Sequence, residues 1–198
     1  MNIMLEFLDK KMLKRKKTAE SMVPVIETRN QEEPVYEKEK QVENFIKNIR
    51  CNGKSLPQYS VKFLSQVARE KEVSQGAFFV TDEKDGRKYI KFLSGFASPE
   101  PDDTHNILEI GEGFPGQVAK DGKMMNISDI PEGYLTIESG LGKAAPVSLL
   151  IFPVKHKNDV IAVIELASFH KFTEEDESFF ESISPFVAEQ IIKCKGKA

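Results

Sequence analysis

Three glycines with the spacing G-x-G-x-x-G form the pattern in this sequence that is most suggestive of ligand binding. Gly111, Gly113 and Gly116 follow a short apolar segment and precede a predicted short helix. In nucleotide-binding folds such glycines let the backbone approach a pyrophosphate, and an acidic residue about 20 positions later binds the ribose. Asp129 and Glu132 stand near that distance. The residues therefore raise dinucleotide binding as a first hypothesis.

The sequence around the glycines argues against that hypothesis. Asp121-Gly122 ends the helix almost at once, and the next predicted strand begins by Met124. A dinucleotide-binding unit instead needs parallel strands joined by a crossover helix of several turns. We therefore interpret the glycines as a tight turn that lets a short helix pack closely. Backbone N–H groups at a helix start near Gly116 remain an alternative site for an anionic ligand group.

The side chains that most often perform catalysis or bind metals show no suitable spacing. His105, His156 and His170 do not share the spacing of a metal site and are predicted to lie at the surface, and only His105 would be placed to bind a haem iron. Ser139 and Ser148 lack a His–Asp pairing of the kind that activates a serine nucleophile. We therefore predict no enzyme, no metal site and no bound cofactor.

The two cysteines and the overall charge limit the cellular setting of the chain. Cys51 and Cys194 lie near opposite ends of the predicted folded region and form no C-x-x-C motif, which argues against a disulfide framework of the secreted type. The formal net charge of −3 argues against nucleic acid as the main partner of the folded part. The sequence shows no secretory signal and no apolar run of about 20 residues. The cytoplasm is the expected location.

The sequence predicts one main domain with an N-terminal extension. Residues 1–34 are interpreted as a flexible segment and linker, because a basic run follows a short helical pattern and prolines follow that. The alternative is that residues 1–17 form a basic amphipathic helix on a membrane surface or a partner. Residues 35–56 are predicted to form a helix and a turn, and residues 57–195 the main domain.

Short apolar segments separated by turn residues predict about six strands in the main domain. The predicted strands are 77–80, 87–97, 107–110, 124–127, 147–154 and 160–169, and the predicted helices are 35–50, 117–120 and two that begin at Ser55 and Thr173. Asp85-Gly86 is a strong hairpin signal, and the last two strands are apolar on both faces, so they belong in the centre of a sheet. We expect Pro185 to kink the final helix. The result is an α+β fold: an antiparallel sheet with helices on one face, and residues 128–146 left to cover the other.

Long ordered loops in compact domains usually bind ligands, so the segment 128–146 marks the predicted pocket. Glu165 is a lone carboxylate in an apolar strand, and it is expected either to bond an internal backbone donor or to line that pocket. Tyr134 and Ser139 supply polar groups on the loop. The predicted ligand-binding residues are Phe96, Phe114, Pro115, Val118, Ile130, Tyr134, Ile137, Ser139, Leu141, Ser148, Leu150 and Glu165.

Several motifs resemble those of the GAF domain family, in the family's order. They are Gly111 to Ala119, Asn126 to Pro131, Ser148 to Val154, Val163 to Phe169 and Phe172 to Asp176. The resemblance covers roughly residues 57–193. It implies a GAF-like (PAS/GAF superfold) central six-stranded antiparallel sheet, with N- and C-terminal helices on one face and a pocket under loops on the other. It also implies a regulatory module that binds a cyclic nucleotide, haem, bilin or small metabolite, and a dimer formed through terminal helices.

The sequence departs from the better-known branches of that family. It contains no Asn-Lys dipeptide, so Phe78 with Asp82-Glu83 is only a fragment of the cyclic-nucleotide pattern. Bilin-binding members use a pocket cysteine, and the free methionine sulfoxide reductase branch uses several in its loops. Cys51 and Cys194 are the chain's two cysteines, and neither lies in a predicted pocket segment.

Three functions therefore remain open from the sequence. The first is a sensory domain that binds an unknown small molecule and signals through its terminal helices to a dimer mate or a partner protein. The second is a dimerisation or docking domain whose pocket has collapsed around its own side chains. The third, which the absence of pocket cysteines disfavours, is a small-molecule oxidoreductase.

Overall fold

The computed structural model describes residues 33–98, 106–140 and 142–196, with side chains from Lys38 onward apart from that of Ser139. The chain divides into a short N-terminal unit, 1–37, and a larger unit, 38–198, which carries the sheet. The elements in order are α2 (Glu33–Asn48), α3 (Leu56–Glu70), β1 (Gln75–Lys84), β2 (Arg87–Phe96), β3 (Ile107–Glu109), α4 (Gly113–Asp121), β4 (Met125–Ile127), β5 (Ile137–Ser139), β6 (Gly142–Ala144), β7 (Ser148–His156), β8 (Asp159–Ser168) and α5 (Glu174–Lys195). The predictions made for residues 1–32 lie outside the described residues.

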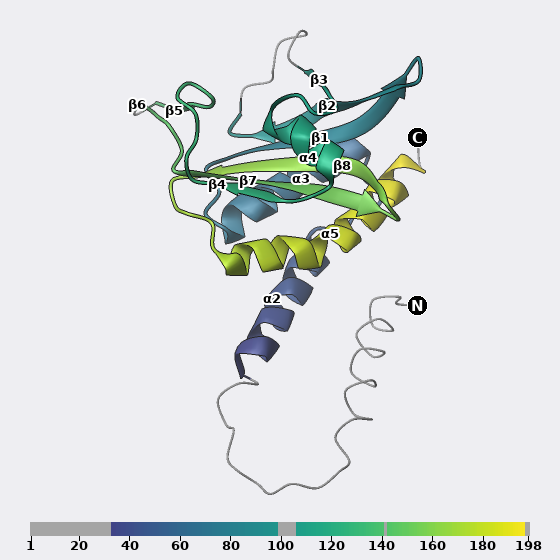
Figure 1. Cartoon of the computed structure of the whole chain (residues 1–198). Helices are drawn as coiled ribbons and strands as arrows, with labels where there is room; N and C mark the ends of the chain where they lie inside the picture. Colours follow the sequence, from purple (N-terminus) through teal and green to yellow (C-terminus); the bar gives the residue numbers. More distant parts are fainter. Residues whose placement is uncertain (1–32, 99–105, 141, 197–198) are drawn as a thin grey trace, which may run out of the picture. The chain divides into compact units, whose positions relative to one another are not determined.

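A six-stranded sheet forms the centre of the larger unit, in the order β3-β2-β1-β8-β7-β4 (Figure 1). Every pair of neighbouring strands is antiparallel. β3 and β4, which flank the glycine turn in sequence, lie at opposite edges of the sheet. They are therefore not the parallel neighbours that a dinucleotide-binding unit requires.

Tight turns set the register of the two long hairpins. Asp85 and Gly86 both have positive φ, 51° and 75°, which suits a two-residue turn between β1 and β2. Lys157, with φ 57°, occupies the corresponding place between β7 and β8. Both hairpins were predicted, although β1 begins and ends beyond the expected 77–80. The short β5–β6 hairpin falls in a segment that the sequence indicated as a loop.

Aromatic side chains fill the layer between the sheet and the helices α2, α3 and α5. Phe63 of α3 is fully buried, and its ring centroid lies 6.1 Å from that of Phe45 and 6.0 Å from that of Phe78. Phe152 of β7 stacks on Phe180 of α5 at 4.9 Å. Burial of rings at these distances adds edge and stacking attraction to the hydrophobic effect. This side of the sheet is therefore a packed core.

The last helix begins where the sequence predicted. Thr173 Oγ1 accepts a hydrogen bond from the Asp176 backbone N–H at 3.3 Å, and Thr173 N–H donates to the Asp176 carboxylate at 3.0 Å. This reciprocal cap satisfies donors that a helix start leaves unpaired. The helix runs on past Pro185 and changes direction along its length (Figure 1). None of the described helices is long and apolar enough to span a membrane.

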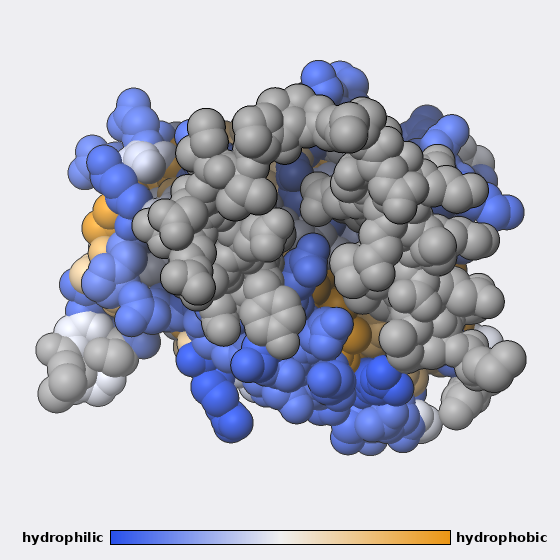
Figure 2. Space-filling model, turned by 90° about the horizontal axis from the view of Figure 1, so that it is seen from below, coloured by the Kyte–Doolittle hydropathy of each residue, from blue (hydrophilic) through white to orange (hydrophobic). Residues whose placement is uncertain are grey.

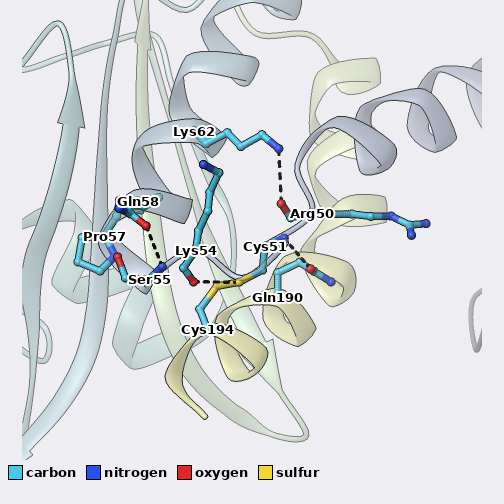
Figure 3. The surroundings of a disulfide bond; sticks show 10 residues. Arg50, Cys51, Lys54, Ser55, Pro57, Gln58, Lys62, Gln190 and Cys194 are labelled. Atoms are coloured by element: carbon cyan, nitrogen blue, oxygen red, sulfur yellow. Dashed lines mark hydrogen bonds between the residues drawn. A yellow bond between two sulfur atoms is a disulfide. The ribbon is translucent and has the colours of Figure 1, made fainter. Parts of the chain in front are cut away.

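Cys51 and Cys194 form a disulfide, which the sequence did not lead us to expect (Figure 3). They are 143 residues apart in sequence, but their Cα atoms lie 6.4 Å apart. The expectation failed because distance along the chain was read as distance in space. Residues at the two ends of the domain lie side by side here, since α2 and α5 pack on the same face of the sheet.

The visible part of the helical side, where no grey residues lie over it, is mainly polar. Figure 2 views the molecule from below, and hydrophilic residues predominate among those that are not grey, with small hydrophobic areas between them. Val61 of α3 and Ile192 of α5 are among the large apolar side chains that stay exposed, at 49% and 40%. Isolated exposed residues of this kind are normal on a folded protein.

Candidate functional site

The two faces of the sheet carry different sets of side chains because residues alternate along a strand. On β7, Leu149 and Ile151 point away from α5 into a second apolar cluster, whereas Phe152 points toward Phe180. On β8, Val163 and Ala167 belong to the same second cluster. We call this side of the sheet the cup face. It is the side on which α4 lies (Figure 1).

The glycine turn holds α4 against the edge of the sheet. A side chain at Gly116 would place its Cβ 2.6 Å from the Glu109 carbonyl oxygen, so the helix approaches as closely as glycine allows. Gly111 and Gly113 have φ of +98° and +61°, which favour glycine. Gly111 N–H donates to the Gly116 carbonyl at 2.8 Å. The interpretation of these glycines as a tight turn under a closely packed helix is confirmed.

The anion-binding alternative at Gly116 is not supported. The helix begins at Gly113, four residues before the predicted start at Gln117. Gly116 N–H is therefore already inside the helix and donates to the Glu112 carbonyl at 3.0 Å. A backbone donor that is used in the helix is not available to an anion.

We call the segment 128–146 the roof, and among its described residues several side chains cover part of the cup face. Ile137 belongs to the second cluster, as does Val118 of α4, and Ile130 and Tyr134 pack against it. The Tyr134 ring lies 4.8 Å from that of Phe114. The roof is thus joined to α4 by an aromatic pair and to the sheet by apolar contacts.

One hydrogen bond joins the roof to the central strand β8. Tyr134 Oη donates to Glu165 Oε1 at 2.8 Å. Glu165 pairs in register with Ala77 on one side and Ile151 on the other, so its carboxyl lies over an apolar part of the sheet. Glu165 was expected either to bond an internal backbone donor or to line the pocket. In the structure its donor is internal, but it is the Tyr134 hydroxyl and not a backbone N–H group.

Burial sets the protonation of this pair. Loss of solvation raises the pKa of the Glu165 carboxyl, and the Tyr134 hydrogen bond partly offsets that effect. Burial, followed by the nearby carboxyl charge, raises the pKa of the Tyr134 hydroxyl, which therefore stays protonated and donates. A carboxyl with a raised pKa in an apolar site is a common feature of ligand-binding and catalytic positions.

The structure brings about half of the predicted site residues together. Phe114, Val118, Ile130, Tyr134, Ile137 and Glu165 lie at the interface of roof, α4 and sheet. Pro115 is buried in α4. Ser139 has its backbone in β5, but its side chain is outside the described part of the chain, and Leu141 lies outside the described residues altogether.

Three predicted residues lie on the helical face instead. Ser148 Oγ donates to the His170 carbonyl at 2.5 Å, just before α5. Leu150 follows two positions later on β7 and shares that face. Phe96 pairs with Gly76, and a Cβ added at Gly76 would lie 3.2 Å from a methyl carbon of Leu64 of α3. Paired residues point to the same face of a sheet, so Phe96 also faces the helices. A bulge at Phe78/Phe79 shifts the β1–β2 register, and this shift cannot be read from apolar spacing alone.

The sequence reasoning also missed a polar hollow of about 330 Å³ beside the end of α4. Its lining includes Lys88, Lys120 and Lys155, with Asp121 and Asp159. These charges come from separate elements with no common spacing, so no sequence pattern could have grouped them. Among the residues that the structure describes, no group of three or more His, Cys, Asp or Glu side chains could hold a metal ion.

Replacing Glu165 by glutamine should change how stability depends on pH. A raised folded-state pKa means that protonation favours the folded protein, so this contribution is present in full below the unfolded pKa of about 4.3. It is lost as pH rises through the folded pKa. Glutamine keeps an acceptor for Tyr134 but carries no charge. We therefore expect equal Tm values for wild type and Glu165→Gln near pH 4, and a higher Tm for the variant at pH 8.

Thermal unfolding from pH 4 to pH 8 measures this difference. Glu138→Gln, at an exposed carboxylate paired with Lys143, is the matched control and should change Tm little at any pH. A wild-type protein that gains stability over Glu165→Gln as pH rises would show that the carboxyl is not destabilised by burial.

Comparison with known proteins gives one family and a set of similar folds. The model of the family described as "GAF domain" matches residues 58–191. No curated protein sequence matches the chain.

The similar solved structures include GAF domains and an enzyme. The GAF domain of a phosphoenolpyruvate-protein phosphotransferase from Coxiella burnetii is 17% identical, with a TM-score of 0.63 over 82% of this chain and 95% of that one. The corresponding domain from Acinetobacter is 18% identical, with a TM-score of 0.61 over 81% and 96%. Free methionine-R-sulfoxide reductase from Neisseria meningitidis, solved with its substrate, is 12% identical, with a TM-score of 0.60 over 89% and 100%. At these identities the likeness shows the fold alone.

Proposed function

Because the chain belongs to the GAF domain family, we propose that it is a regulatory module that binds a small molecule between the cup face and the roof. The bound state is then passed through the terminal helices to a dimer mate or another protein. The observation that carries this proposal is the hydrogen bond between Tyr134 on the roof and Glu165 on the central strand.

A carboxyl placed among apolar side chains costs stability, and its Tyr134 partner offsets only part of that cost. A ligand with its own hydrogen-bond donor can replace the tyrosine hydroxyl and satisfy the carboxyl as well or better. The surrounding side chains, among them Phe114 and Ile137, favour a ligand whose remaining surface is largely apolar. The ligand class is therefore a small apolar molecule with one hydroxyl or amino group.

A short path of contacts connects the roof to the last helix. β4 leads directly into the roof, and Asn126 of β4 donates to the Phe172 carbonyl at 3.1 Å and to the Glu177 carboxylate at 2.7 Å. Phe172 N–H in turn donates to Ser148 Oγ at 3.3 Å. A displaced roof that pulls on Asn126 would change the contacts at the start of α5. This supports signalling through the terminal helices.

A second candidate function is docking or dimerisation without a ligand. It is favoured by the packing on the cup face, where Val118 and Ile137 of the second cluster are already buried. In that case the roof and the sheet form a closed core. A third function, oxidoreductase activity, is raised by the similar fold of methionine sulfoxide reductases, but both cysteines of this chain lie on the helical side.

We further propose a cytoplasmic location, no catalytic activity, and partners that are proteins or small molecules and not nucleic acid. Dimerisation would use the terminal helices, and light scattering of the full chain tests it. Contact of residues 1–17 with a membrane surface stays a prediction outside the described residues.

A thermal-shift screen of the full chain against a metabolite library tests the sensory function. A ligand at about 100 times its Kd stabilises by about 2.7 kcal/mol, which corresponds to a Tm rise of about 5–10 °C for a protein of this size. Glu165→Gln should reduce the shift. Tyr134→Phe, which removes the hydroxyl that the ligand would displace, should retain or enlarge the shift, and Glu138→Gln should retain it. A library with no stabilising compound would favour the docking function, and a shift unchanged in Glu165→Gln would place the ligand elsewhere.

A further inference from the structure

The two cysteines join the ends of the domain on the side of the sheet away from the cup face. Cys51 follows α2, and Cys194 lies in the last turn of α5. Their side chains are 4% and 3% exposed, and the Cα separation of 6.4 Å is within the usual range for a disulfide. They are also the chain's only two cysteines, so each has one possible partner within the chain.

The surroundings of the pair supply partners for both the oxidised and the reduced state (Figure 3). Cys51 backbone N–H donates to Gln190 Oε1 at 3.0 Å, a buried bond that does not depend on the sulfur. The Lys54 carbonyl oxygen lies 3.2 Å from Cys51 Sγ, so it can accept a hydrogen bond from the Cys51 thiol in the reduced state. Both contacts hold Cys51 and neither requires the covalent bond to Cys194.

Without the disulfide, α2 is held by noncovalent contacts alone. Phe45 and Ile46 of α2 are buried, and so is Ile49, the residue that follows the helix. Lys38 forms an ion pair with Glu175 at 2.8 Å, but both side chains are exposed, and such pairs contribute little. Breaking the disulfide should thus loosen α2 and the end of α5 while the sheet and its two clusters stay intact.

Basic residues flank both cysteines. Arg50 and Lys54 lie beside Cys51, and Lys193 and Lys195 lie on either side of Cys194. Figure 3 shows the Lys54 carbonyl at the disulfide, the Lys62 ammonium group beside the Arg50 carbonyl, and the Lys54 and Arg50 side chains directed away from the sulfur atoms. Positive charge at this end of the domain attracts anionic reactants.

We propose that Cys51 and Cys194 are a reversible redox site that fastens α2 to the end of α5 when oxidised and releases it when reduced. The oxidant is an anionic low-molecular-weight disulfide. One cysteine thiolate attacks a sulfur of that disulfide and expels a thiolate, which leaves a mixed disulfide on the protein. The second cysteine thiolate displaces the other half. Two protein thiols lose two electrons and two protons, and the small disulfide becomes two thiols. Access requires opening of the last turn of α5, which ends at Lys195 and is followed by the exposed Gly196.

The test equilibrates the full chain with a series of ratios of glutathione to glutathione disulfide. Alkylation and intact mass report the oxidised fraction, thermal unfolding reports Tm, and hydrogen exchange reports the release of α2. We expect one reversible transition between dithiol and disulfide. Reduction should lower Tm by about 5–15 °C, because the bond closes a loop of 143 residues. It should also speed exchange at least ~10-fold in residues 38–50 and 188–196, with little change in β1, β7 and β8.

The double variant Cys51→Ser/Cys194→Ser is the control, and it should match the reduced wild type at every glutathione ratio. The wild-type protein itself carries the test if the variant folds poorly. A disulfide that persists at every ratio would show that the bond is permanent. Thiols that never oxidise would show that the bond does not form. Either result, or equal exchange of α2 in the two states, would overturn the proposal.

Discussion

Replacing Phe63 by alanine should lower the free energy of unfolding by about 3–5 kcal/mol. The side chain is fully buried at the point where three elements meet, with Phe45 of α2 and Phe78 of β1 on either side of its ring. Alanine would leave a cavity lined by aromatic rings, which cannot relax to fill it completely. Chemical unfolding monitored by circular dichroism measures the loss, and Tm should fall by about 6–20 °C.

Val61→Ala is the matched control on the same helix. Val61 is 49% exposed, so its truncation should change stability by about 0.5 kcal/mol or less. A small effect for Phe63→Ala, comparable with that of Val61→Ala, would mean that the layer between helices and sheet is not packed as described.

Replacing Gly116 by valine should be similarly damaging, for the opposite reason. Even the first added carbon would lie 2.6 Å from the Glu109 carbonyl oxygen and 3.2 Å from the Gly111 nitrogen, both of them backbone atoms that cannot rotate away. Overpacking of this kind typically costs about 1–3 kcal/mol, occasionally more, and we expect alanine to lie within that range and valine at or above its top.

Gly140→Ala controls for the change of residue type, because a Cβ there meets nothing within 4 Å and its φ is not positive. Its stability should stay within about 1 kcal/mol of wild type or rise slightly, since alanine restricts the unfolded chain. If Gly116→Val unfolds at the same denaturant concentration as Gly140→Ala, α4 does not pack on the edge of the sheet as closely as the structure indicates.

Much of the fold could be predicted because it depends on local patterns. Asp85-Gly86 encodes its own turn, and Thr173 with Asp176 encodes a helix start, so both were predicted to the residue. The continuous apolar runs of β7 and β8 indicated central strands. Phe114, Val118, Ile130, Tyr134 and Ile137 were expected to face the cup because the glycine turn and the long loop mark the segments beside the sheet, and the structure packs them together.

The remainder depends on pairings between distant segments. Ser148 and Leu150 were expected on the cup face, but a strand that is apolar on both faces gives no signal for which alternate residues face which side. Phe96 lies beyond a bulge that shifts the register of its hairpin. The Cys51–Cys194 disulfide and the Tyr134–Glu165 hydrogen bond join residues 143 and 31 positions apart, and no local pattern encodes either one.

The sensory account is tested most directly by NMR chemical-shift mapping with the compound that most stabilises the full chain. It predicts that the largest changes fall on Phe114, Tyr134, Ile137 and Glu165, and that smaller ones reach Asn126 and the first turn of α5. Changes confined to the lysine-lined hollow near Lys120 and Lys155, or to the helical surface, would contradict binding between roof and sheet.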